Sequence, residues 1–405
     1  MSKARKVFAV TLLVALAWAD VPVAEAQPPI RIGATLAQTG VYAAGAEPLL
    51  RGYQLCVKHV NDRGGVLGRR LELLVYDDAS DPATAVRLYE KLIAQDKVKL
   101  VLGPYPSAIT DPVASVTEKH KILMVAPASA TTSIYRKGRK FIFSVHPPVE
   151  VYLEGLIDLA AKKGLKTVAV INPDTLSGRA VAQGTSELAK KKGLQVVFAE
   201  AYPVASTDFS ALLTKVRAAN PDVLASAVSQ DPMAITRQLK ALNVNPRMYG
   251  LAGTGDQFYE IMGRDAEFIY VATPWLAELV EVRAGGLIPI ARQYPGAREF
   301  AEAHRKEFPG AGLSWSSAAG YGSCQILVEA IRRTHSLEGG KLRDAISKMD
   351  HDTVFGRFRV DRDGVQIGHK FVMFQWQDGK KAMVWPEELA ANQPRFPTPP
   401  WSQRP

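Results

Sequence analysis

The sequence predicts an α/β fold made of two doubly wound lobes, each built around a parallel sheet. From residue 30 onward, short runs of strand-forming residues alternate with helical patterns, an order typical of right-handed βαβ units. These runs are almost continuously apolar, as expected of strands that are covered on both faces. The sequence has about ten such runs, which is more strands than a single open sheet usually holds. Two sheets, and therefore two lobes, are favoured over one.

The expected elements follow the chain in three groups. The first group has strands at 30–36, 71–76, 100–102, 122–125 and 141–145, with helices at 48–61, 82–95 and 107–119. The second has strands at 167–171, 195–198, 223–228 and 248–251, with helices at 179–192, 209–219 and 232–242. The third has helices at 296–307, 316–334 and 341–349, then a hairpin of strands 358–360 and 370–376 around the Asp363-Gly364 turn. Residues 391–405 are rich in proline and are expected to form a surface tail.

The N-terminus has the three parts of a secretory signal. Basic residues precede an apolar run at 7–19, and Ala24-Glu25-Ala26 offers a small-x-small cleavage pattern, so the mature chain is expected to begin at Gln27. A membrane anchor is the alternative, but a run of about 13 residues is shorter than the ~20 that span a bilayer. Cysteine is absent from the cleavage point, which argues against a lipid anchor. The mature protein is therefore expected to be periplasmic.

Charge and cysteine content limit the function classes. The 405-residue chain carries a formal charge of +10, but its basic residues are scattered, and the clusters at 136–140 and 190–192 fall on a loop and a helix end. Nucleic acid is therefore not the expected partner. Cys56 and Cys324 are too few for a disulfide framework or a cysteine metal site. Both lie in apolar helical stretches, so we expect buried free thiols, with one disulfide as the alternative in an oxidising compartment.

Catalytic and cofactor motifs are weak or missing in the sequence. It contains neither a Walker pattern nor a Gly-x-Ser-x-Gly elbow, and its histidines form no His-x-x-x-His pair. Asp77, Asp78 and Asp81 could form an acidic site, but Asp81 precedes Pro82 and is better explained as a helix cap. The Asp361-x-Asp363-Gly364 segment lacks the later ligands of a calcium loop and is expected to be a turn. We expect neither metal nor cofactor, and no enzymatic activity.

The predicted sheets imply a ligand crevice at the carboxyl ends of their strands. The loops there are rich in Ser, Thr, Gly and Tyr, and lie at 37–46, 103–109, 126–134, 172–178, 229–232 and 251–257. Ser107 begins a predicted helix, where a hydroxyl beside free backbone N–H groups can bind a carboxylate. A plain N-cap serine is the equal alternative at this position.

At these loops the sequence resembles the periplasmic leucine/isoleucine/valine-binding family, the type I solute-binding proteins of ABC importers. The matching pieces include Asn61-Asp62-Arg63-Gly64-Gly65, Tyr76-Asp77-Asp78-Ala79-Ser80-Asp81-Pro82 and Leu102-Gly103-Pro104-Tyr105-Pro106-Ser107, followed by 125–130, 208–210 and 237–239. The resemblance covers residues from about 28 to about 385, and its specificity comes from the order and spacing of the pieces.

The resemblance implies the type I periplasmic binding protein fold, with two lobes joined by a three-crossing hinge. The crossings are expected near 145–148, 272–275 and 353–356. The first lobe would then hold 27–146 and 275–353, and the second 147–274 and 354–390, with 391–405 as the tail.

The resemblance also implies ligand contacts. In the first lobe they are Tyr42, Tyr105, Ser107 and the loop residues Ala128, Ser129, Ala130 and Thr131. In the second lobe they are Ser177, Gln230, Ala252 and Asp256, and at the second crossing the contact is Trp275. Family members place a carboxylate for the ligand ammonium where this chain has Ala252. Either Asp256 replaces that carboxylate, or the ligand has no α-amino group, and we favour the second hypothesis because an unpaired buried ammonium is strongly disfavoured.

Together these features predict a monomeric solute-binding protein of an ABC importer. It would capture a small carboxylate-bearing ligand by hinge closure and pass it to permease subunits in the inner membrane. The ligand would be a branched-chain or aromatic amino acid, or an aromatic or other organic acid. A ligand-binding sensor module for amides or organic acids is the first alternative, and an exported α/β enzyme is the second.

Overall fold

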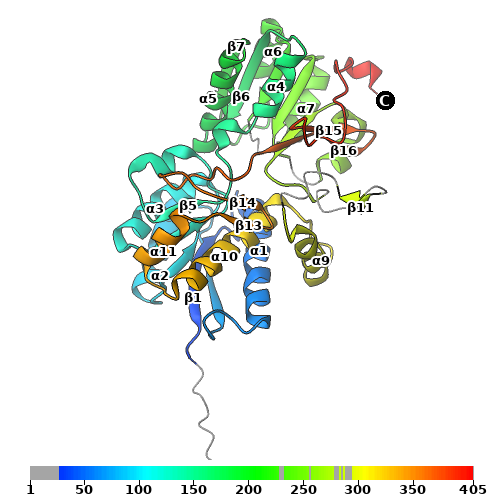
Figure 1. Ribbon diagram of the computed structural model, residues 1–405. Coiled ribbons are helices and arrows are strands. Elements are labelled where there is room, and N and C mark those ends of the chain that lie inside the picture. Colours follow the sequence, from blue (N-terminus) through cyan, green and yellow to red (C-terminus); the bar gives the residue numbers. More distant parts are fainter. Residues whose placement is uncertain are drawn as a thin grey trace, which may run out of the picture.

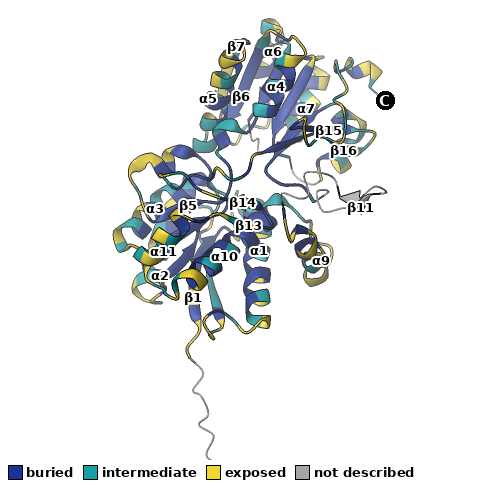
Figure 2. Ribbon diagram, viewed as in Figure 1, coloured by how far each residue is buried: buried dark blue, intermediate teal, exposed yellow. Residues whose placement is uncertain are grey.

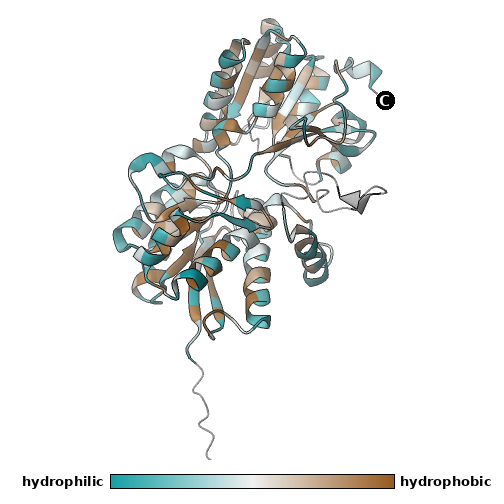
Figure 3. Cartoon of the chain, in the orientation of Figure 1, coloured by the Kyte–Doolittle hydropathy of each residue, from teal (hydrophilic) through white to brown (hydrophobic). Residues whose placement is uncertain are grey.

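The computed structural model describes residues 27–227, 232–254, 257–277, 282–283, 286–287 and 294–404, so the expected signal segment lies outside it. These residues form two α/β lobes, one above the other in Figure 1, each with a central sheet between helices. Figure 2 shows buried strands at the centre of both lobes and exposed residues on the outer helix faces. The central strands of both sheets are largely hydrophobic in Figure 3. The predicted two-lobe α/β architecture is confirmed.

The first lobe contains a five-stranded parallel sheet in the order β2-β1-β3-β4-β5. Its strands are β1 (Ile30–Leu36), β2 (Leu71–Asp77), β3 (Leu100–Leu102), β4 (Leu123–Ala126) and β5 (Ile142–Ser144). The helices of this lobe are α1 (Ala43–Asp62), α2 (Pro82–Ala94), α3 (Ser107–His120), α9 (Ala297–Glu307), α10 (Trp315–Thr334) and α11 (Gly339–Ser347). Asp81 caps α2 as predicted, since its carboxylate accepts a 2.7 Å bond from the amide of Thr84.

The second lobe contains a seven-stranded mixed sheet in the order β16-β15-β10-β9-β8-β6-β7. Its strands are β6 (Thr167–Pro173), β7 (Gln195–Tyr202), β8 (Val223–Ser226), β9 (Met248–Ala252), β10 (Tyr270–Thr273), β15 (Val372–Gln377) and β16 (Lys380–Trp385). Its helices are α4 (Glu154–Lys162), α5 (Leu176–Lys191), α6 (Ser210–Ala219), α7 (Pro232–Ala241) and α8 (Phe258–Met262). Only β15 and β16 run antiparallel to their neighbours. Two short hairpins, β11 (Val282–Arg283) with β12 (Gly286–Leu287) and β13 (His351–Thr353) with β14 (Gly356–Phe358), lie outside the two sheets.

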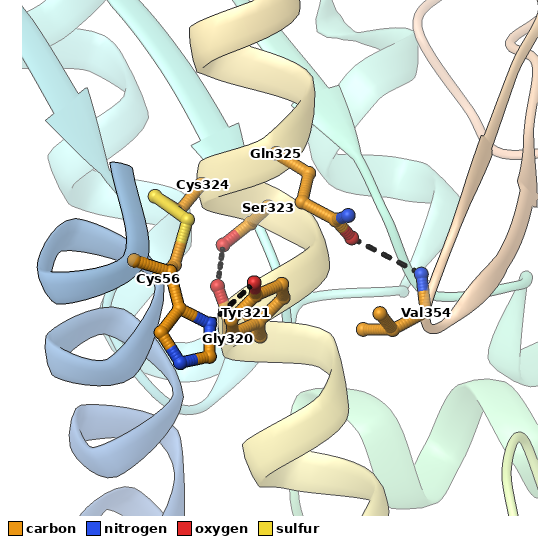
Figure 4. Close-up of a disulfide and its surroundings, with 8 residues drawn as sticks. Cys56, Gly320, Tyr321, Ser323, Cys324, Gln325 and Val354 are labelled. Carbon is orange, nitrogen blue, oxygen red and sulfur yellow. Dashed lines mark hydrogen bonds between the residues drawn. A yellow bond between two sulfur atoms is a disulfide. The ribbon is translucent and has the colours of Figure 1, made fainter. Parts of the chain in front are cut away.

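Helices α1 and α10 pack closely and carry the two cysteines. A Cβ added to Gly52 would lie 2.2 Å from the carbonyl oxygen of Ser317, so only glycine permits this approach. The approach brings the Cα atoms of Cys56 and Cys324 to 6.2 Å, and the two residues form a disulfide (Figure 4). The prediction of free thiols is therefore wrong. The cysteines lie 268 residues apart in sequence, and only helix packing brings them together.

The chain passes between the lobes three times, as the type I fold requires. It leaves the first sheet after β5, enters the second at β6, and returns after β10 to form α9, α10 and α11. After β14 it stays against the first sheet, because the amide of Ser144 donates a 2.9 Å bond to the carbonyl of Gly364. Val365 is also buried in the first-lobe core beside Ile142. We therefore propose that the third crossing lies near 367–371, later than the 353–356 implied by the resemblance.

The C-terminal hairpin differs from the one predicted. The Asp361–Gly364 turn forms, but it closes only one isolated bridge between Val360 and Gln366. Strand β15 pairs instead with β10 and with β16, across a second Asp-Gly turn in which Asp378 and Gly379 have φ of 52° and 73°. The sequence offers an Asp-Gly pair at 363–364 and another at 378–379. The hairpin forms at the second pair because β15 pairs with the buried strand β10.

Two further boundaries differ from prediction. Helix α1 begins at Ala43 instead of residue 48, because Ala46 is fully buried and Gly45 lies against the ring of Tyr105. The C-terminal segment is not a loose surface tail. The indole of Trp401 is buried and donates a 2.9 Å bond to the carbonyl of Val244, and the amide of Thr398 donates to Arg247 O at 3.0 Å, which docks this segment on the second lobe.

Candidate functional site

The predicted crevice loops lie where the two lobes face each other. The loops after β1, β3 and β4 come from the first lobe, and those after β6 and β9 from the second. Helices α3 and α5 are in contact, and Leu176 at the start of α5 packs against the first-lobe core. Residues of both lobes therefore meet at the carboxyl ends of their strands (Figure 1).

Ser107 and Thr131 form a buried hydroxyl pair at the first-lobe edge of the crevice. Ser107 is the first residue of α3 and is 2% exposed, and Thr131 is 1% exposed. The hydroxyl of Thr131 donates a 3.2 Å bond to the hydroxyl of Ser107. The first N–H groups of a helix have no partner within that helix, so they and the hydroxyl of Ser107, whose own proton is not used in its bond with Thr131, present several donors in one place. This arrangement suits a carboxylate.

The loop after β4 is held from both sides. The hydroxyl of Ser129 is paired with that of Thr110, and the backbone carbonyl of Ser129 accepts from the hydroxyl of Tyr135. Ala130 is buried, and its carbonyl accepts a 3.1 Å bond from the amide of Val149 in the second lobe. Ala128, with its partly buried side chain, begins the loop. The hydroxyl of Ser129 therefore stabilises the loop, and the hydroxyl that contacts Ser107 belongs to Thr131.

A second link joins the same loop to the second lobe. The carboxylate of Glu150, in the short helix η2 (Val149–Val151), accepts from the amide of Thr132 at 3.0 Å and from its hydroxyl at 2.6 Å. Because η2 follows the first crossing directly, these bonds tie the loop after β4 to the beginning of the second lobe.

Tyr42 and Tyr105 form an aromatic wall beside Ser107. Their rings meet edge to face, with centroids 6.2 Å apart, and both side chains are partly buried. Burial, and after it the neighbouring Tyr42, raises the pKa of Tyr105, so its hydroxyl stays neutral. Such a pair can stack on the apolar part of a small ligand.

The second-lobe candidates are less complete. Ser177 is the second residue of α5 and is partly buried, beside Leu176 at the interlobe contact. Ala252 ends β9 and is fully buried, so the position expected for an acid is apolar. Gln230 and Asp256 lie outside the described residues.

Trp275 lies at the second crossing and serves in packing. It is 2% exposed, its ring packs on Phe300, and its indole donates a 3.0 Å bond to the carbonyl of Val354. The amide of Val354 in turn donates to the side chain of Gln325 at 3.0 Å (Figure 4). Trp275 also lines a small cavity of about 30 Å³ next to Trp315. These contacts favour hinge packing, the alternative to a stacking contact.

Sequence reasoning missed an aromatic cluster at the hinge. His146, in the first crossing, lies within ring-contact distance of Tyr152, Trp315, Phe355 and Phe371. Its members come from separate parts of the chain, so only the hydrophobic character of each local segment was visible in the sequence. Tyr152 could have been noticed, because it follows the first crossing and lies in the turn before the second-lobe helix α4.

The described ranges hold no group of three or more His, Cys, Asp or Glu side chains able to bind a metal ion. Within those ranges, too, no helix has the length and hydrophobicity needed to cross a membrane. A groove of about 540 Å³ lies elsewhere, on the outside of the first lobe between α1 and β2.

Two doubly wound lobes, three crossings and a crevice between strand ends define the class of two-lobe solute-binding proteins. The chain belongs to the periplasmic binding protein family, whose model matches residues 29–381. Leu/Ile/Val-binding protein homolog 7 of Brucella suis biovar 1 is 24% identical over 392 residues, covering 92% of this chain and 96% of that protein.

Solved structures share the fold. Leucine-binding protein LivK from Thermotoga maritima has a TM-score of 0.75 at 22% identity, covering 89% of this chain and 100% of that one. A solute-binding protein of an ABC transporter from R. palustris, in complex with benzoate, has a TM-score of 0.74 at 16% identity, covering 88% and 95%. The type I fold and the solute-binding class are thereby established.

Proposed function

We propose that this protein is an extracytoplasmic solute-binding protein of an ABC importer, and that it captures a small carboxylate by closing its two lobes. The observation that carries the proposal is the buried pair of Ser107 and Thr131 at the start of α3. The signal sequence before Gln27 provides the route of export, and permease subunits in the inner membrane are the expected receivers. We infer no catalytic step, because the parts of the crevice loops that the structure describes offer no paired nucleophile and base.

The ligand we favour is an organic acid without an α-amino group, with an aromatic ring as its apolar part. Ala252 supplies no counter-charge for an ammonium, and a buried ammonium needs one. Tyr42 and Tyr105 provide a surface for an aromatic ring. The benzoate-bound protein from R. palustris demonstrates that this fold can hold such a ligand. The leucine-type relatives support the alternative, an amino acid whose ammonium is paired by Asp256.

The test is thermal unfolding of the chain from Gln27 against matched compounds. The panel contains branched-chain and aromatic amino acids, the same aromatic acids without the amino group, and short amides. At 100 times its dissociation constant a ligand adds about 2.7 kcal/mol, which shifts Tm by about 5–10 °C in a lobe of ~150–250 residues. A shift with the acids alone supports the proposed ligand, and a shift with the amino acids alone supports Asp256 as the ammonium partner.

A control separates site binding from general stabilisation. At the same ligand concentration, Ser107→Ala should roughly halve the ligand-induced shift, whereas Ser347→Ala, at the exposed end of α11, should leave it unchanged. Small-angle X-ray scattering then tests closure, since the radius of gyration should fall at saturating ligand. A ligand that binds without changing the solution shape would contradict the closing mechanism, and a compound that is converted to product would revive the enzyme alternative.

A further inference from the structure

Tyr152 lies at the base of the second lobe, directly after η2. Its side chain is 4% exposed, and its ring meets Phe371 edge to face with centroids 4.0 Å apart. On another side lies His146, at 6.0 Å between ring centroids. These contacts hold the ring of Tyr152 in place and thereby determine where its hydroxyl points.

The hydroxyl of Tyr152 is directed toward the crevice edge of the second sheet. A Cβ added to Gly253 would lie 3.2 Å from this hydroxyl, and Gly253 directly follows β9, where second-lobe ligand contacts are expected. Tyr105 of the first lobe lies near enough that, after burial, it is the next cause of the raised pKa of Tyr152. The hydroxyl therefore lies between the aromatic wall of the first lobe and the end of β9.

This hydroxyl differs from the hydroxyls of two other buried tyrosines in the protein. Tyr53 donates to the carbonyl of Gly103 at 2.8 Å, and Tyr89 donates to that of Leu102 at 2.6 Å. For Tyr152, the described part of the chain provides no hydrogen-bond partner. Tyrosine hydroxyls normally have one, and this hydroxyl lies where a ligand group in the crevice can provide it.

We propose that Tyr152 is a polar ligand contact of the second lobe and that it binds an uncharged hydrogen-bonding group, a hydroxyl or carbonyl oxygen, at the end of the ligand remote from its carboxylate. This inference rests on the proposed function and extends it to ligand selection. A neutral phenol can donate and accept one hydrogen bond each, but it cannot balance a cation. With Ala252 in place of an acid, Tyr152 would favour a hydroxy or oxo acid over an amino acid.

Gly253 affects access to the hydroxyl of Tyr152. Its φ of 83° is in the region that favours glycine, and any side chain there would lie against the hydroxyl of Tyr152. Glycine thus keeps the hydroxyl accessible from the crevice.

The test is a double-mutant cycle between the protein hydroxyl and the ligand hydroxyl, read by calorimetry. The probes are benzoate, 3-hydroxybenzoate and 4-hydroxybenzoate, and the variants are Tyr152→Phe and Tyr249→Phe. Tyr249 is the matched control, because it is a second-lobe tyrosine on β9 that is 1% exposed and packs in the core beside Tyr202 and Thr236. Melting temperatures of both variants without ligand check that they fold.

We expect the wild-type protein to bind one hydroxybenzoate more tightly than benzoate. Tyr152→Phe should weaken that compound by about two- to tenfold and leave benzoate unchanged, and Tyr249→Phe should change neither. Equal effects on all three compounds, or no hydroxyl preference in the wild type, would overturn the role of Tyr152 while the proposed function stands. If no carboxylate binds to the wild type, the proposed function fails, and this inference fails with it.

Discussion

Acidification should destabilise this protein through two histidines buried at the hinge. His146 is 4% exposed and His369 is 8% exposed, and burial lowers the pKa of each from 6.5 to about 4. The neighbours of His146 are aromatic rings, and its Nδ1 lies 2.8 Å from the carbonyl of Pro147. His369 has its Nδ1 3.2 Å from the carbonyl of Arg357 and contacts Tyr294. Neither contact supplies a negative charge for a protonated ring.

The direction and size of this pH effect follow from the linkage between proton binding and folding. Because the unfolded chain takes up a proton on each histidine near pH 6.5 and the folded chain only near pH 4, the unfolded state binds more protons between these values. The free energy of unfolding therefore falls as pH is lowered through this window, by about 2 kcal/mol per histidine at pH 5. Both histidines together amount to about 4 kcal/mol, a large part of the ~5–15 kcal/mol that stabilises a typical domain.

Urea unfolding at pH 7.5 and pH 5.0 measures this loss. Protonating carboxylates also contribute, so the informative quantity is the difference between the wild type and His146→Phe, which keeps an aromatic ring but cannot titrate. We expect the pH dependence to shrink by about 2 kcal/mol in His146→Phe. The control is His335→Asn, at an exposed helix end whose φ of 51° suits asparagine. An unchanged pH dependence in His146→Phe would refute the reasoning.

Three further changes have expected outcomes. Replacing Cys56 and Cys324 by serine should lower stability by roughly 2–5 kcal/mol in urea unfolding, and reduced wild type should match the variant, because the bond closes a long loop of the unfolded chain. Gly52→Ala should cost about 1–3 kcal/mol, since its methyl group would meet the carbonyl of Ser317, whereas Gly340→Ala, near only a flexible side-chain end, should be neutral or stabilising in calorimetry. Ser107→Ala should weaken carboxylate binding by about tenfold in calorimetric titration, whereas Ser347→Ala should leave it unchanged.

Local patterns predicted most individual elements but not their long-range pairing. The cap at Asp81 and the turn at Asp361–Gly364 formed as expected, since each depends on neighbours within a few residues. Strand β15 was placed in the wrong hairpin because both Asp363-Gly364 and Asp378-Gly379 satisfy the same local rule. The competition was decided by β10, about 100 residues earlier in the chain, a partner that no local pattern can reveal.

For the candidate site, too, the sequence predicted some residues, whereas the roles of others depend on tertiary contacts. Ser107 at a helix start and Tyr42 before another helix could be read from the sequence, because strand-loop-helix order places those loops at one sheet edge. The pairing of Thr131 with Ser107, and the commitment of Trp275 to hinge packing, depend on which side chains meet across separate segments. The ligand contacts of Gln230 and Asp256 remain predictions from the resemblance.

The sequence alone determined the alternation of strands and helices, the two-lobe architecture and the positions of the crevice loops, since these depend on hydrophobic period, helix ends and loop order. Only the tertiary structure decided that Cys56 is bonded to Cys324, that His146 is buried among aromatic rings, and that Tyr152 points its hydroxyl toward the end of β9. The physical reason is that each of these depends on distances between residues far apart in the chain. Such distances are established by the packing of whole helices and lobes, and no local preference encodes them.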